Sequence, residues 1–201
     1  MMRSMRAVAA LALLVMPLAA AAQQKSTGAQ APSAKSEPSL VDTLTFIRQT
    51  LESYGTLVYP QVAGPFQNIT NKLSSTAAPC NIKIDLDWFV SPQADKPPER
   101  TQGEVYEIAL ASIDPQRVAT NEVKLSVGGY LVTLTTTNNA PVIQDRIVFF
   151  QRRSDGQSLE GQVSKRAHAD IGITATPEDA SRLANAFSHA VVLCGGKPSA
   201  F

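Results

Sequence analysis

Apolar and polar residues alternate along much of the chain between residues 80 and 174, which is the pattern of β-strands that bury one face. From Cys80 to Trp88 every second residue is apolar, and the residues between them are Asn, Lys or Asp. Similar segments follow, separated by short stretches rich in Gly, Pro, Asn and Asp. Because parallel strands need long crossovers, these short turns predict antiparallel pairing. The further strands are expected near 106–110, 123–127, 130–137, 144–150 and 169–174.

A different period, of three and four residues, precedes the strands. In 40–54 the apolar residues recur at helical spacing, so one side of a helix can be buried there. Ser39 and Asp42 have the spacing of a capping box, and Gly55 stands where a helix would end. The segment between that helix and the first strand, 56–79, contains three prolines and no sustained period. It is therefore expected to be an irregular connection.

The clearest helical pattern closes the chain. Thr176 is suited to cap the helix and Pro177 to begin it, and an apolar stripe then runs through Phe187 to Cys194. Gly195 follows the stripe and is expected to stop the helix. His189 is spaced half a turn away from this stripe, so it is expected on the solvent side.

These elements predict an α+β fold. We expect a single antiparallel, strongly bent sheet or partial barrel of about six strands, with an N-terminal helix and a C-terminal amphipathic helix packed on it. Both apolar stripes should face the inner side of the sheet. Ile47 and Phe187 should then be buried, whereas Arg182 and His189 should be exposed.

Antiparallel strands followed by one amphipathic helix resemble the pleckstrin-homology-like architecture, a bent sheet whose open end is closed by that helix. Residues Ala180–Gly196 and Ser39–Gly55 are also similar to segments of uncharacterised exported bacterial proteins. Pleckstrin-homology domains that bind phosphoinositides use basic residues in the first loop between strands. The corresponding loop here, Ser91–Gly103, supplies Lys96 and Arg100. The resemblance implies an architecture and does not imply a substrate.

The N-terminus has the three parts of a secretory signal peptide. Arg3 and Arg6 precede a run of 12 apolar residues, Ala7–Leu18, and small residues lead up to Ala22. A helix needs roughly 20 apolar residues to cross a bilayer, so no membrane span is expected. We predict cleavage after Ala22 and a periplasmic or secreted protein.

The domain organisation follows from this assignment: residues 1–22 are the signal peptide, 23–38 a flexible linker and 39–197 a single globular domain. The linker has no aromatic or large aliphatic residue, so it cannot bury enough surface to offset the entropy of ordering it. Removing the signal takes away two basic residues and changes the formal net charge from +1 to −1. A chain so near neutrality is not expected to bind nucleic acid.

Cys80 and Cys194 are the only two cysteines in the sequence. Both are placed on the buried side of their predicted elements, and the expected compartment is oxidising. We therefore predict a disulfide between them, with two buried free thiols as the alternative. A redox-active pair is disfavoured because the two cysteines lack Cys-x-x-Cys spacing.

The sequence contains few residues typical of catalysis or metal binding. His168 and His189 are the only histidines, and neither has enough neighbouring ligand residues to hold a metal. The chain has no Gly-x-Ser-x-Gly motif, no Walker loop and no dinucleotide fingerprint. We therefore predict no catalytic, metal or cofactor-binding residues and no cofactor.

Two acidic pairs lie at strand positions of the predicted sheet. Asp85 with Asp87, and Glu104 with Glu107, are interpreted as residues of the solvent-facing sides of strands. A pair of catalytic carboxyl groups brought together from distant positions stays open as an alternative.

Three functions of different classes remain. The first is a non-catalytic binding or adaptor domain with a protein or peptide partner, and a small-molecule ligand is a further option. The second is a small secreted hydrolase, and the third is a structural component of the envelope. A deep cleft with convergent buried acids would favour the enzyme, whereas a flat surface or a free sheet edge would favour the binding domain.

Overall fold

The computed structural model describes residues 37–59, 66–74, 78–91, 99–124, 128–149 and 159–200. The described residues belong to one compact unit, Glu37–Phe201. The predicted signal peptide and almost all of the predicted linker lie outside the described residues, as does Lys96. The signal and linker assignments therefore stay predictions.

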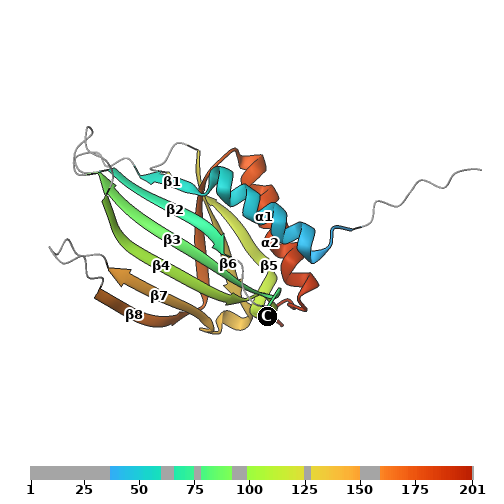
Figure 1. The fold of residues 1–201 in the computed structure, drawn as a ribbon. Helices are drawn as coiled ribbons and strands as arrows, with labels where there is room; N and C mark the ends of the chain where they lie inside the picture. Colours follow the sequence, from blue (N-terminus) through green and yellow to red (C-terminus); the bar gives the residue numbers. More distant parts are fainter. Residues whose placement is uncertain are drawn as a thin grey trace, which may run out of the picture. The chain divides into compact units, whose positions relative to one another are not determined.

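Two helices have the caps that the sequence indicates. α1 spans Leu40–Tyr54 and begins at a capping box, in which the Ser39 hydroxyl accepts from the Asp42 N–H and the Asp42 carboxylate accepts from the Ser39 N–H. α2 spans Pro177–Leu193, and the Thr176 hydroxyl accepts from the backbone N–H of Asp179 at 3.1 Å. The two helices pack side by side (Figure 1).

Nine strands of the described residues form two antiparallel sheets, arranged as Figure 1 shows. The larger sheet has the order β1-β2-β3-β4-β7-β8, and the smaller sheet has the order β5-β6-β9. All strand pairs within both sheets are antiparallel. The strands are β1 Thr56–Tyr59, β2 Phe66–Ser74, β3 Asn81–Ser91, β4 Glu99–Ala109, β5 Ile113–Glu122, β6 Gly129–Thr136, β7 Ile143–Phe149, β8 Leu159–Arg166 and β9 His168–Thr174.

The predicted α+β class is confirmed, with a six-stranded antiparallel sheet and a helix near either end of the folded unit. The three strands of the smaller sheet lie in addition to those six. The expectation of an irregular connection over 56–79 is wrong, because β1 and most of the long strand β2 lie there. In β2 the inward residues are Ile69, Asn71 and Leu73, so the polar Asn71 interrupts the apolar period that would have revealed the strand.

Asp114 and Pro115 are a pair typical of turns and separate two predicted strands in the sequence, but the turn lies elsewhere. The chain turns earlier, through the short 3-10 helix η1 (Leu110–Ser112), and both residues lie inside β5. The pairing of β5 with β6 shifts register between Ile113 and Val118, which accommodates a proline that cannot donate to the ladder.

One continuous core holds both sheets and both helices together. α2 packs mainly on β5 and also contacts β6, while α1 packs on α2 and β2. Ile47 and Phe187 are fully buried and Arg182 is exposed, as predicted. His189 differs from the prediction: it is half-buried, because its Nε2 lies 3.0 Å from the carbonyl oxygen of Pro38 in the segment that leads into α1.

Cys80 and Cys194 form a disulfide, with Sγ atoms 2.14 Å apart and Cα atoms 5.5 Å apart. Cys80 lies in the turn before β3, and Cys194 is the C-cap residue of α2. The bond therefore connects the larger sheet to the helix that packs on the smaller sheet. No helix in the described part of the chain is long and apolar enough to cross a membrane.

Candidate functional site

The inner face of the larger sheet changes from apolar to polar along its strands. In β4 the successive inward residues are Ile108, Tyr106 and Glu104, all at most 5% exposed. In β7, which pairs with β4, Asp145 lies between the inward Ile143 and Ile147 and is completely buried. The apolar end joins the protein core, whereas the polar end faces a cavity.

This cavity, which we call the inter-sheet cavity, has a volume of about 350 Å³. The larger sheet supplies one wall, through Asn71, Trp88, Glu104 and Arg166 among others. The smaller sheet supplies the facing wall through Leu131 of β6 and through Asp170 and Gly172 of β9. Its volume lies in the range of sites that take small organic molecules.

Gly172 allows the two sheets to approach each other at this wall. A Cβ atom at this position would lie 2.8 Å from the Leu57 side chain of β1. The carbonyl oxygen of Gly172 also accepts a hydrogen bond of 2.6 Å from Nδ2 of Asn71 in β2. The same Asn71 nitrogen donates to the carbonyl of Gly55, at the end of α1. Asn71 therefore ties α1, β2 and β9 together beside the cavity.

A cluster of charged residues lies at the polar end. Nε of Arg166 is 2.5 Å from Oδ2 of Asp145, and a second guanidinium nitrogen is 3.8 Å from Oε1 of Glu104. The hydroxyl of Ser164 donates to the same Asp145 oxygen at 3.3 Å. One guanidinium thus faces two carboxyl groups that have almost no contact with solvent.

The assignment of Glu104 to the solvent-facing side of its strand is wrong. Glu104 is in phase with the inward residues Tyr106 and Ile108, and Arg166 of the distant strand β8 compensates its burial. Asp145 is likewise in phase with apolar neighbours and was not singled out from the sequence. In both strands every second residue faces inward, and this alternation indicates a buried position even where one of the residues is polar.

Burial raises the pKa of Glu104 above its ordinary value. Hydrogen bonding from Tyr106 opposes this, the Asp145 carboxylate raises the pKa further, and both the Arg166 charge and the Trp88 indole lower it. The pKa of Tyr106 is raised by burial and by the neighbouring Glu104. Burial lowers the pKa of Arg166, but Tyr106, Asp145 and Glu104 together raise it more, so the guanidinium stays charged.

Some buried polar atoms around the cavity have no hydrogen-bond partner among the described residues. Among them are Oδ1 of Asn71 and Oδ1 of Asp145. Buried polar groups in folded proteins are nearly always hydrogen-bonded, so each such atom calls for a partner. Asn71 lines the inter-sheet cavity, where a bound molecule could supply its partner.

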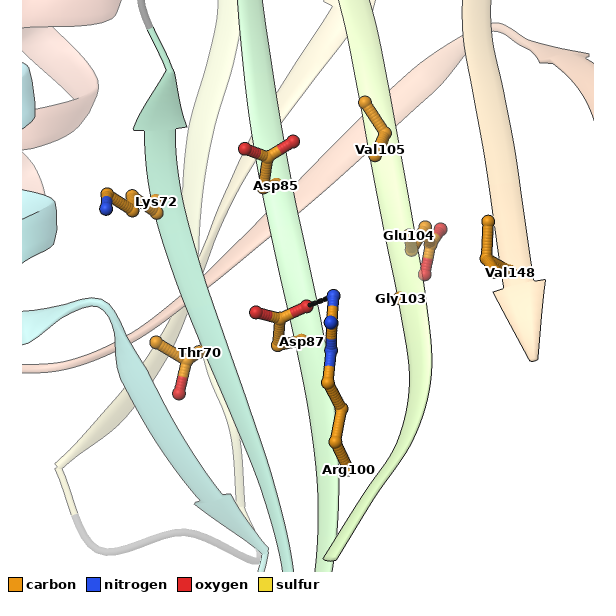
Figure 2. Close-up of a pocket in the computed structure, with 9 residues that line it drawn as sticks. All are labelled: Thr70, Lys72, Asp85, Asp87, Arg100, Gly103, Glu104, Val105 and Val148. Carbon is orange, nitrogen blue, oxygen red and sulfur yellow. Dashed lines mark hydrogen bonds and ion pairs between the residues drawn. The ribbon is translucent and has the colours of Figure 1, made fainter. Parts of the chain in front are cut away.

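The opposite face of the same sheet has a second hollow, of about 450 Å³, which we call the outer groove (Figure 2). On the surface of this groove Arg100 pairs with Asp87, and the hydroxyl of Ser74 donates to Asp85. Glu104 lines the outer groove as well as the inter-sheet cavity. Figure 2 shows Lys72 extending away from the Asp87–Arg100 pair. Asp85 and Asp87 are only partly buried on this face, as the alternation predicts.

The histidines lie apart from each other. His168, at the start of β9, is exposed, and its Nε2 is 4.0 Å from Oδ2 of Asp170. Oδ1 of Asp170 accepts a hydrogen bond of 2.6 Å from the hydroxyl of Thr133 in β6. Within the described ranges, no three His, Cys, Asp or Glu side chains are grouped so as to hold a metal ion.

The fold and the cavity together define an α+β protein with a partly polar cavity between two antiparallel sheets. Comparisons with protein-family models, with curated proteins and with solved structures found no significant match to this chain.

Proposed function

We propose that the protein is a non-catalytic binding domain of the bacterial periplasm or exterior, and that its ligand is a small amphipathic molecule held in the inter-sheet cavity. The observation that supports this most is an unpartnered buried polar atom, Asn71 Oδ1, in the wall of a ligand-sized cavity. Apolar side chains such as Leu131 and Ile147 line the same cavity, so a ligand would meet both kinds of surface.

The disulfide supports the proposed compartment, because such bonds persist in oxidising environments. The resemblance to pleckstrin-homology-like domains remains part of the proposal, as an architecture only. A peptide partner could instead pair with β1 or β8, the end strands of the larger sheet. We favour the cavity because its unpartnered atom points to a ligand, whereas free edges occur in most open sheets.

The chain provides its own reporter for this proposal, since Trp88 is the only tryptophan in the sequence and lines the cavity. We expect titration with 2-phenylethanol, a neutral amphipathic probe, to change the tryptophan fluorescence saturably. A dissociation constant of roughly 1 mM would correspond to about 4 kcal/mol, which suits a probe of this size. Isothermal titration calorimetry should give the same constant.

Two matched variants test which of the two hollows binds the probe. Leu131→Phe adds volume inside the inter-sheet cavity and should weaken binding about tenfold or more. Val148→Phe makes a comparable change at the outer groove and should leave binding unaltered. The proposal is wrong if the probe gives no saturable signal by either method, or if both variants weaken binding equally.

A hydrolase is the second candidate, and a specific observation favours it. Glu104, whose pKa burial raises, and Asp170 both line the cavity from facing sheets. Many glycoside hydrolases use two carboxyl groups in this way, with the one of higher pKa acting as the acid. Turnover of chromogenic aryl glycosides that is lost in both Glu104→Gln and Asp170→Asn would establish it. The absence of turnover across a panel of such substrates would argue against it.

A further inference from the structure

The charges around the inter-sheet cavity are unequal. Glu104 and Asp170 line the cavity, and Asp145 lies directly behind Arg166. Arg166 is the only Lys or Arg residue among the described residues that line it. The cavity and its surroundings therefore hold three carboxyl groups against one guanidinium, with the exposed His168 imidazole 4.0 Å from Asp170, and a proton taken up by Glu104 would still leave more carboxylates than guanidinium groups.

The hydrogen-bonding groups of the cavity wall favour the same class of ligand. Asn71 Oδ1 lines the cavity, has no partner and can only accept hydrogen bonds, whereas the Trp88 indole interacts with the Glu104 carboxylate. The Nδ2 donor of Asn71 is already used by two backbone carbonyls. A ligand that offers more donors than acceptors would satisfy this set, and the indole ring of Trp88 adds an aromatic surface that attracts cations.

Arg166 does not offset this preference. Its Nε is bonded to Asp145 and a second guanidinium nitrogen faces Glu104, so its charge is balanced inside the cluster. An anionic ligand approaching Arg166 would also approach both carboxyl groups. Removing an unpaired charge from water is costly, so such a ligand would be rejected.

We propose that the ligand of the inter-sheet cavity carries a protonated amine or another organic ammonium group, which lies between the Trp88 indole and the carboxyl groups of Glu104 and Asp170. This inference rests on the proposed function and specifies its ligand class. An ammonium group brings donors and positive charge to a site with an unpartnered acceptor and more carboxyl groups than guanidinium groups. The apolar remainder of the ligand would contact Leu131, Ile147 and Leu86.

A matched series of probes tests the charge preference directly. 2-Phenylethylamine, 2-phenylethanol and 3-phenylpropionate share a phenyl group and a two-carbon spacer but carry a cationic, a neutral and an anionic group at neutral pH. We expect the amine to bind at least about tenfold more tightly than the alcohol, and the carboxylate to bind most weakly. Trp88 fluorescence and calorimetry provide two independent measurements.

Variants then locate the source of the preference. Glu104→Gln and Asp170→Asn should each reduce the ratio of amine to alcohol affinity several-fold while leaving alcohol affinity nearly constant. Asp85→Asn and Asp87→Asn make the same charge change at the outer groove and should leave the ratio unaltered. Circular dichroism of each variant establishes whether it is folded before its ratio is used.

The outcomes separate the two levels of the proposal. Equal affinity for the amine and the alcohol, or tighter binding of the carboxylate, overturns the ammonium preference while the cavity remains a binding site. A ratio that falls equally in the outer-groove variants also overturns it, because the preference would then come from the overall charge. Failure of all three probes to bind overturns the proposed function itself.

Discussion

The two faces of the larger sheet carry the same kinds of charged residue in different surroundings. On the outer face, Asp87 and Arg100 form a pair in which both side chains stay at least one-third exposed. On the inner face, Arg166 bonds to Asp145, which has no exposure at all. Water can replace either partner of the outer pair, whereas Asp145 has no contact with water and without Arg166 keeps only the Ser164 hydroxyl. The comparison shows that the burial of a charged residue, more than its type, distinguishes the candidate site from the solvated surface.

The largest expected effect concerns the disulfide, which connects the larger sheet to α2. Reducing the Cys80–Cys194 disulfide releases a constraint over a sequence separation of 114 residues, which in the chain-entropy model is worth roughly 4 to 5 kcal/mol. A loss of 4 kcal/mol corresponds to roughly 8 to 16 °C in the midpoint of thermal unfolding. Scanning calorimetry with and without reductant measures it. The double variant Cys80→Ala/Cys194→Ala is the control and should not respond to reductant. Two alkylatable thiols in the unreduced protein would contradict the prediction.

Arg166→Leu should destabilise the protein by about 3 to 5 kcal/mol, because it leaves Asp145 buried without a counter-charge. The free energy of unfolding is measured by urea denaturation at neutral pH. Replacing the carboxylate as well, in Arg166→Leu/Asp145→Leu, should recover part of the loss. A single variant that loses less than about 1 kcal/mol would mean that the inner pair behaves like a surface pair.

Asn71→Ala should cost about 1 to 3 kcal/mol, because it removes the Nδ2 donor shared by the carbonyls of Gly55 and Gly172. Thr70→Ala, the neighbouring residue that lines the outer groove, serves as the matched control and should change stability by about 0.5 kcal/mol or less. Equal losses of stability in the two variants would mean that the inner and outer faces of β2 do not differ in this respect.

The pH dependence of stability should reveal Glu104. Because burial raises its pKa in the folded state above the ordinary value of 4.5, the folded protein holds this proton more tightly than the unfolded chain does. Its contribution to stability is therefore present at low pH and is lost as the pH rises from about 4.5 through the folded pKa. Glu104→Gln should gain stability relative to the wild type across that window. Urea denaturation at a series of pH values measures the difference, with Glu107→Gln, exposed on the other side of β4, as the control. A difference that does not vary with pH would contradict the prediction.

The smallest effect is expected at the outer groove. Arg100→Leu removes a cation paired with Asp87, yet it should cost no more than about 1 kcal/mol because both partners remain accessible to water. Added salt should reduce even this difference. A loss as large as that of Arg166→Leu, measured by the same urea denaturation, would show that the outer pair is more than a solvated contact.

Periodicity predicted the elements whose buried positions are uniformly apolar. Both helices, the disulfide and the strands around Leu86, Ile108 and Val132 belong to this group. β2 was missed because Asn71 occupies a buried position, and β8 was missed because an edge strand paired only with β7 needs no apolar alternation.

The candidate site was missed for a related reason. Strand parity alone places Glu104 inward, but the burial of a carboxyl group becomes acceptable only through partners from elsewhere in the chain. Those partners are Asp145 and Arg166, which come from two later strands. No local pattern in the sequence connects them.

The position of Cys194 near the end of the chain also bears on biogenesis. Its partner Cys80 is synthesised 114 residues before it, so Cys80 stays an unpaired thiol until α2 has been made. β9, which completes the smaller sheet, also comes late. A chain truncated before residue 194 would keep Cys80 as a free thiol. We therefore expect the oxidation state of Cys80 to distinguish finished molecules from incomplete ones.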